Sequence, residues 1–160
     1  MKQSLSLAKG SRMVRQYPGT ASLTVKAPLE AVWDAAVSLE WLVGWDQIAF
    51  LAPPEEGSAF TLTDEHRPIR ARFTQFEKPN CLAWRAADGG SGALHLSADG
   101  DSTSMRWEYV GVPHAFVDRI ATGAMALFVP GKVKKLCNED AAKELRNLAR
   151  RVVRRSGEKA

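Results

Sequence analysis

The sequence has few cysteines and no apolar stretch long enough to cross a membrane. Its two cysteines, Cys81 and Cys137, form no CxxC pair, which excludes zinc-ribbon and thioredoxin-type motifs. We expect two reduced thiols rather than a disulfide. No run of about 18 apolar residues occurs, so no membrane-spanning helix is predicted. The apolar stretch near the N-terminus is too short for a signal peptide, and we expect a cytoplasmic protein.

Common catalytic and cofactor motifs are also absent. The three histidines, His66, His95 and His114, form no HxH, HxxxH or HExxH pattern, so neither a metal site nor a cofactor is expected. There is no GxGxxG, P-loop or GxSxG, the signatures of nucleotide binding and of serine hydrolases. His66 is the one catalytic candidate, because it sits among Asp, Glu and Arg in a polar turn where burial could tune its pKa. A solvated turn is the alternative.

The composition is that of one globular domain. The 160 residues are 45% hydrophobic and 25% charged, with a net charge of +4. The excess is concentrated from residue 131 onward, where ten Lys or Arg stand against four Asp or Glu. A basic helix face is usually solvated, and that is the interpretation we favour over contact with nucleic acid, a membrane surface or a protein partner.

The first third of the chain predicts a strand followed by two short helices. Leu23 and Val25 alternate with polar residues in the strand Thr20–Lys26, after a turn at Pro18-Gly19. Pro28 suits a first helical turn, and Leu29, Val32, Trp33 and Ala36 follow at helical spacing. Ser38 is positioned to cap a second helix over Leu39–Trp45.

Six further strands are predicted in the middle of the chain. Apolar and polar residues alternate there, and turn-forming Gly, Pro, Asn and Asp separate the runs, which is typical of an antiparallel meander. The predicted strands are Gln47–Leu51, Ala59–Thr63, Ile69–Glu77, Cys81–Ala86, Ala93–Ser97 and Ser104–Val110. Alternation places Arg70, Arg72, Arg85 and Arg106 on the outer face, where they would guard against aggregation. An inward arginine would instead bind a carboxylate or phosphate.

The last third is predicted to be helical. An apolar stripe that includes Phe116 and Ile120 runs through Pro113–Val129, which is either a lid or the first half of a bent final helix. Pro130-Gly131 interrupts it. A long amphipathic helix follows, with apolar residues from Val133 to Val153 at i, i+3 and i+4.

Three segments together resemble the START/Bet v 1-like (SRPBCC) superfamily, and within it the polyketide cyclase/dehydrase and lipid-transport branch. They are VKAPLEAVWDAAVSLEWLVGW (Val25–Trp45), RARFTQFEKPNCLAWR (Arg70–Arg85) and HLSADGDSTSMRWEY (His95–Tyr109), followed by the closing amphipathic helix. The resemblance implies an α+β helix-grip fold, in which a curved antiparallel sheet of about six to seven strands surrounds a long C-terminal helix. We expect one domain over residues 19–155, preceded by an N-terminal arm or short strand over 1–18 and followed by a tail over 156–160. The family has no invariant catalytic motif, so no catalytic residue is carried over.

A curved sheet with one helical cover leaves room for a cavity, and its inner face carries bulky aromatic residues. Trp33 is expected to pack in the core, whereas Trp41 and Trp45 either pack or contact a ligand at the cavity mouth. The predicted cavity residues are Trp41, Trp45, Phe60, Phe73, Trp84, Leu94, Trp107, Tyr109, Phe116 and Ile120.

The function that we favour is binding or transport of a small hydrophobic or amphipathic ligand. The resemblance leaves a cyclase or dehydratase open, with acid–base groups in the cavity. A module that binds a protein partner through the basic helix is the third alternative. No specific nucleic-acid partner is expected, and weak contact of the basic helix with a membrane surface stays open.

Overall fold

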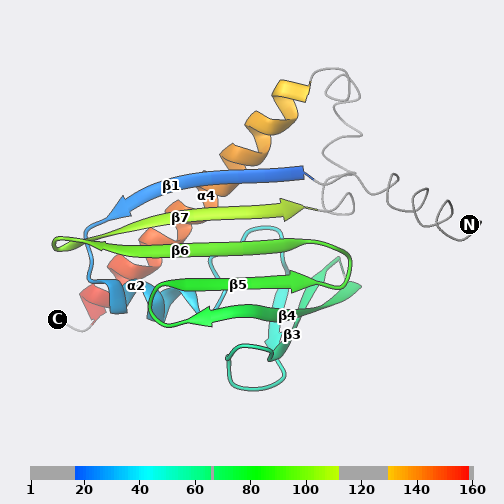
Figure 1. Cartoon of the computed structure of the whole chain (residues 1–160), viewed down its shortest axis with the longest axis horizontal. Helices are drawn as coiled ribbons and strands as arrows, with labels where there is room; N and C mark the ends of the chain where they lie inside the picture. The colour runs from blue at the N-terminus through cyan, green and yellow to red at the C-terminus, as the bar shows by residue number, and fades with distance from the viewer. Residues whose placement is uncertain (1–16, 66, 112–129, 159–160) are drawn as a thin grey trace, which may run out of the picture.

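The computed structural model describes residues 17–65, 67–111 and 130–158. Seven strands form one antiparallel sheet, in the order β1-β7-β6-β5-β4-β3-β2. Figure 1 shows the sheet with the helices beside it. The strands are β1 (Tyr17–Val25), β2 (Gln47–Phe50), β3 (Ala59–Asp64), β4 (Arg67–Glu77), β5 (Cys81–Ala86), β6 (Ser91–Asp99) and β7 (Ser102–Gly111). The helices are α2 (Leu29–Ala36) and α4 (Pro130–Glu158).

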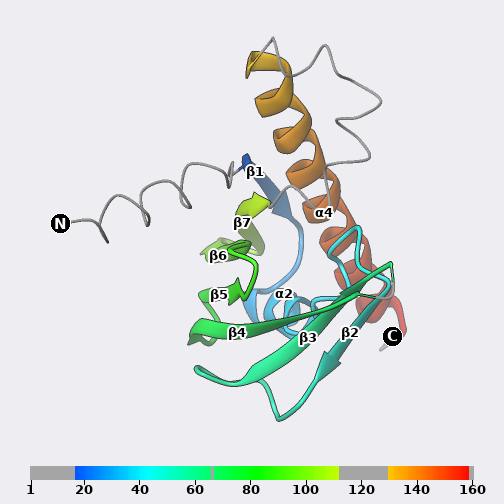
Figure 2. The ribbon, with the colours of Figure 1, turned by 90° about the vertical axis from the view of Figure 1, so that its right-hand side faces the viewer.

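The sheet curves around α2 and is closed by α4 (Figure 2). Its curvature is helped by a β-bulge in β4 between Phe73 and Gln75, where the register with β5 shifts. α4 packs mainly against β1 and also contacts α2 and β7, while α2 contacts β6 and β7 as well. The expected helix-grip architecture is therefore confirmed.

The core lies between the sheet and these two helices. α4 buries one stripe at helical spacing, and β7 supplies Met105 and Trp107 from the opposite side. The buried residues of α4 are Cys137, Ala141, Glu144, Leu145, Leu148 and Val152. The amphipathic stripe predicted for this helix is confirmed except at Leu136 and Val153, which are 53% and 61% exposed. The helix begins at Pro130, where a proline is well tolerated.

The predicted second short helix is wrong. Leu39–Trp45 forms turns, and Leu39 has a φ of 59°. Leu39 and Trp41 are both fully buried, whereas a helix would point two residues at this spacing about 200° apart. The Trp41 indole instead donates a 2.8 Å hydrogen bond to the carbonyl of Ala36 at the end of α2.

The turn predicted at Pro18-Gly19 is also wrong, because both residues lie within β1. Gly19 pairs with Tyr109 of β7. A Cβ atom on Gly19 would lie 2.5 Å from the Tyr109 ring and 2.5 Å from the carbonyl oxygen of Cys137. Gly19 therefore allows the Tyr109 ring and α4 to approach the strand closely, and it does not form a turn.

The six other predicted strands are confirmed, with ends that differ by a few residues. Arg70, Arg72, Arg85 and Arg106 are exposed, as alternation predicts. His66, Phe116, Ile120 and the segment Pro113–Val129 lie outside the described residues, and the domain limits 19–155 stay a prediction. Among the described helices, none is long and apolar enough to cross a membrane.

Candidate functional site

Six aromatic rings lie together, five on the inner face of β2, β3, β4 and β5 and one on α2. We call this set the aromatic array: Trp33, Phe50, Phe60, Phe73, Phe76 and Trp84. Phe60 of β3 and Phe73 of β4 are fully buried, and their ring centroids lie 4.7 Å apart. The array arises because inward positions alternate with polar ones along β3, β4 and β5.

Three of the six ring contacts within the array are edge to face, two are tilted and one is stacked. Phe60 meets Trp84 at 6.1 Å with an interplanar angle of 84°. Phe76 joins Phe73 at 5.4 Å and Trp33 of α2 at 5.1 Å. These separations and angles are those that aromatic pairs prefer. The array is thus a continuous aromatic wall from α2 to β5.

Trp84 carries an unpaired hydrogen-bond donor. Its indole nitrogen is buried and has no hydrogen-bond partner in the part of the chain that the structure describes. The indoles of Trp41 and Trp107, by contrast, donate to the Ala36 carbonyl and to the Glu144 carboxylate. Buried polar groups are nearly always paired, so an orphan donor in an aromatic wall is where a ligand acceptor would be accommodated.

Glu144 is a buried carboxylate between α4 and the sheet. It is 7% exposed and accepts hydrogen bonds from Trp107 Nε1 at 3.4 Å and from the backbone N–H of Val43 at 3.2 Å. Glu144 was not among the predicted site residues. Its spacing could have predicted a buried carboxylate, because Glu144 lies three residues after Ala141 and four before Leu148, on the buried stripe of the helix.

Tyr109 and Cys137 form a second polar contact between β7 and α4. The Tyr109 hydroxyl donates to the backbone carbonyl of Cys137 at 3.1 Å. Burial raises the pKa of Tyr109, and the nearby Cys137 and Asp140 raise it further. Burial also raises the pKa of the Cys137 thiol. Both groups are therefore protonated at neutral pH and offer hydrogen-bond donors rather than anions.

The predicted cavity residues fall into two groups. Phe60, Phe73 and Trp84 belong to the aromatic array. Trp41, Trp107 and Tyr109 form a second group beside α4. Trp41 meets Trp107 edge to face with centroids 4.8 Å apart, and Trp107 stacks on Tyr109 at 6.4 Å. Leu94 is fully buried, and Trp45 is partly buried against the core. Trp33, Phe50 and Phe76 were not among the predicted cavity residues. Trp33 is buried, as expected for a core residue.

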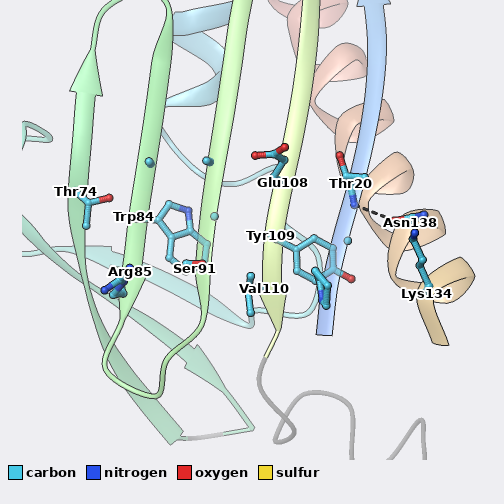
Figure 3. A pocket seen from close by; sticks show the side chains of 15 residues that line it. Thr20, Thr74, Trp84, Arg85, Ser91, Glu108, Tyr109, Val110, Lys134 and Asn138 are labelled. Carbon is cyan, nitrogen blue, oxygen red and sulfur yellow. Dashed lines mark hydrogen bonds between the residues drawn. The ribbon is translucent and has the colours of Figure 1, made fainter. Parts of the chain in front are cut away.

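A hollow of about 510 Å³ crosses β4, β5, β6, β7 and β1 and reaches α4. We call it the outer hollow (Figure 3). On the inner face of the sheet, the Tyr109 ring packs against Gly19, and the Trp84 and Trp107 rings pack against Gly92. The hollow therefore opens on the outer face of the sheet. Residues lining it are Pro18, Gly19, Thr20, Thr74, Ala83, Trp84, Arg85, Ser91, Gly92, Ala93, Glu108, Tyr109, Val110, Lys134 and Asn138.

The basic face of α4 is exposed to solvent, with two arginines held by other elements. Arg151 pairs with Glu40 at 2.9 Å, and Arg155 donates to the carbonyl of Asp34. Exposed residues of this face include Lys135, Lys143, Arg146, Arg150 and Arg154. A role for this face in partner or membrane contact stays a prediction.

No protein-family model and no curated protein sequence matches the chain. Several solved structures are similar to it. The Zhui aromatase/cyclase from Streptomyces sp. R1128 has a TM-score of 0.62 and 15% identity, covering 89% of this chain and 96% of that one. TTHA0849 from Thermus thermophilus has a TM-score of 0.60 and 17% identity, with 87% and 99% covered. Norcoclaurine synthase from Thalictrum flavum, in complex with dopamine and hydroxybenzaldehyde, has a TM-score of 0.52 and 12% identity, with 88% of each chain covered. The likeness is one of fold.

Proposed function

We propose that this chain, which has the helix-grip fold of the START/Bet v 1-like superfamily, binds a small aromatic or amphipathic molecule against the aromatic array. The observation that carries the proposal is the buried indole N–H of Trp84 within that wall, which has no hydrogen-bond partner among the described residues. A ligand with an oxygen acceptor would pair this donor. Because leaving a buried donor unpaired costs about 1–3 kcal/mol, pairing it favours the bound state.

The array also defines the body of the ligand. Its rings meet at angles from edge-to-face to stacked, as with 84° for Phe60–Trp84 and 10° for Phe50–Phe73. Such a wall favours a flat apolar body, since each well-placed aromatic contact contributes about 0.5–1.5 kcal/mol. The ligand chemistry that follows is a planar apolar skeleton bearing a carbonyl or hydroxyl oxygen.

The similar structures are consistent with this chemistry. One is an aromatase/cyclase, and another is a synthase bound to dopamine and hydroxybenzaldehyde, two aromatic compounds that carry oxygen. Fold alone does not fix function, so the argument rests on the array and on Trp84.

The test is to look for a bound molecule and for stabilisation by added ligands. Native mass spectrometry of gently purified protein should reveal a small organic molecule that leaves on denaturation. A panel of naphthols and naphthyl ketones should raise the midpoint of thermal unfolding, since a ligand at 100 times its Kd stabilises the folded state by about 2.7 kcal/mol. Naphthalene sulfonates of similar size serve as the charged control. An empty chain that no member of the panel stabilises contradicts the proposal.

A second candidate is acid–base catalysis of cyclase or dehydratase type. The observation that favours it is a buried carboxylate, Glu144 of α4, bonded to Trp107, which lies two residues before the neutral phenol Tyr109 on β7. Glu144 would take a proton from the carbon between two carbonyls, and Tyr109 would donate a hydrogen bond to the enolate oxygen. Exchange of that carbon's hydrogen for deuterium in 1-phenyl-1,3-butanedione, followed by NMR, measures the step. If exchange is no faster with the wild type than with Glu144→Gln, the proposal of acid–base catalysis is contradicted, whereas the proposal of ligand binding is unaffected.

A further inference from the structure

Three chemically reactive side chains lie together on the outer face of the sheet, on neighbouring strands. The Cys81 sulfur on β5 lies 3.7 Å from Nδ1 of His95 on β6. Nε2 of the same imidazole lies 4.0 Å from Oε2 of Glu108 on β7. A thiol, an imidazole and a carboxylate thus follow one another across three strands.

The strand register accounts for this juxtaposition. Cys81 is directly opposite His95, and Glu108 is diagonal to His95 because it pairs with Ala93. Leu94 and Leu96, on either side of His95, point inward and are buried, as are Leu82 after Cys81 and Trp107 before Glu108. The cluster is therefore built by antiparallel pairing on the face opposite the aromatic array.

We propose that Cys81 is a nucleophile that accepts an acyl group from an activated ester or thioester, with His95 as its general base and Glu108 as a positioning residue. A nucleophile within reach of a base, with the base held by a third group, is the arrangement that covalent catalysis uses. The site is separate from the proposed ligand site, and neither depends on the other.

The surrounding charges decide how Cys81 would be activated. Burial raises the pKa of the Cys81 thiol, and the carboxylate of Glu77 on β4 raises it further. The thiol is therefore protonated at neutral pH, and its attack requires removal of the proton by His95. Arg106, opposite His95, pairs with Glu108 from the other side and holds that carboxylate in place.

The reaction balances without any further reagent. As the sulfur attacks the acyl carbon, the thiol proton passes to Nδ1 of His95. The bond from the acyl carbon to the leaving oxygen or sulfur then breaks, and the leaving group takes up the proton. The products are an S-acyl Cys81 and a free alcohol or thiol.

The outer hollow provides a place for the acyl compound next to the cluster. Glu108 belongs to both, and the next outward positions along β5 and β6 are the small residues Ala83 and Ala93. Cys81 itself is 5% exposed, so only a small acyl group reaches its sulfur. Arg85, at the far side of the hollow, would favour a substrate that carries a negative charge.

The test uses 4-nitrophenyl acetate and the full chain in a Cys137→Ala background, so that Cys81 is the sole thiol. We expect a burst of about one nitrophenolate per chain and an acetyl group on Cys81 by peptide mass spectrometry. Cys81→Ser should abolish the burst, and His95→Gln should slow it at least about tenfold at neutral pH. Ser97→Ala, two residues along the same face of β6, is the control and should leave the burst unchanged.

The rate of acetylation, as distinct from its extent, separates this role from a merely structural contact. Glu108→Gln should slow the burst while Cys81 is still fully acetylated in the end, because the carboxylate that holds the imidazole is lost. Acetylation confined to lysines, or a Cys81 burst with the same rate in His95→Gln, overturns the proposal. Circular dichroism of each variant excludes loss of fold as the cause.

Discussion

The indole nitrogen of Trp107 lies 3.4 Å from Oε1 of Glu144, and both residues are buried. Oε2 of the same carboxylate accepts the backbone N–H of Val43 at 3.2 Å. One carboxylate thus joins the last strand, the closing helix and the turns that follow α2. A buried charge is tolerated there because donors face it from two directions.

Replacing Glu144 with alanine should lower the free energy of unfolding by about 2 kcal/mol. The substitution leaves the Trp107 and Val43 donors unpaired inside the core, and hydrogen bonds to charged groups are worth about 1.5–3 kcal/mol. Urea denaturation followed by tryptophan fluorescence measures the change. Glu139→Ala, exposed on the same helix, is the control and should change stability by less than about 0.5 kcal/mol. Equal effects of the two substitutions would contradict the role assigned to Glu144.

Gly92→Ala should destabilise the protein by about 1–3 kcal/mol. A Cβ atom there would lie 2.3 Å from the Trp107 ring and 2.9 Å from the Trp84 ring, and both rings are packed. Near-UV circular dichroism and urea denaturation report the displacement of the rings and its cost. Gly157→Ala in α4, where no atom lies within 4 Å of the added Cβ, should be neutral or stabilising. A neutral Gly92→Ala would show that the two rings are not packed as described.

Trp84→Phe and Trp107→Phe make the same change in ring size at two buried sites and should differ in cost. Trp107→Phe removes a donor that Glu144 uses, whereas Trp84→Phe removes a donor without a partner among the described residues. We expect Trp107→Phe to be more destabilising by about 1–2 kcal/mol. Chemical denaturation of both variants in parallel measures the difference. Equal losses would indicate that the Trp84 indole is paired.

Tyr109 predicts a loss of stability at alkaline pH. Its pKa is raised in the folded state, so the unfolded chain loses the phenol proton first, from about pH 10 upward. Folding is then disfavoured as pH rises, by at most about 1.4 kcal/mol per pH unit. Tyr109→Phe should be less stable than wild type by about 1 kcal/mol at pH 8, through loss of the bond to Cys137, and this gap should narrow above pH 10. A gap that stays constant to pH 11 would contradict a buried neutral phenol.

Much of the fold follows from the sequence because alternation and turn residues mark each strand. The run Cys81–Ala86 was predicted with the ends that the structure has. The helix predicted at Leu39–Trp45 failed because tertiary burial of Leu39 and Trp41 outweighs the local capping signal of Ser38. Local patterns indicate which face a residue takes, but not which distant element covers it.

The candidate sites depend on contacts that no local pattern encodes. The alternation of apolar and polar residues along β5 predicts that the Trp84 ring points inward. It does not predict that the indole nitrogen lacks an acceptor among the described residues, because that depends on the elements packed around the ring. The Cys81–His95 contact arises from the register of β5 and β6, and residues 81 and 95 are far apart in the sequence. In contrast, the position of Glu144 on an apolar stripe was readable from helical spacing.

The most direct test of the proposed ligand site is the affinity of wild type and Trp84→Phe for two matched ligands, measured by isothermal titration calorimetry. 1-Acetylnaphthalene offers a carbonyl acceptor, and 1-ethylnaphthalene has nearly the same shape without one. If the Trp84 indole pairs with a ligand oxygen, Trp84→Phe weakens binding of the ketone about fivefold and changes binding of the hydrocarbon by less than about twofold. An equal loss for both ligands, or none for either, would contradict the account.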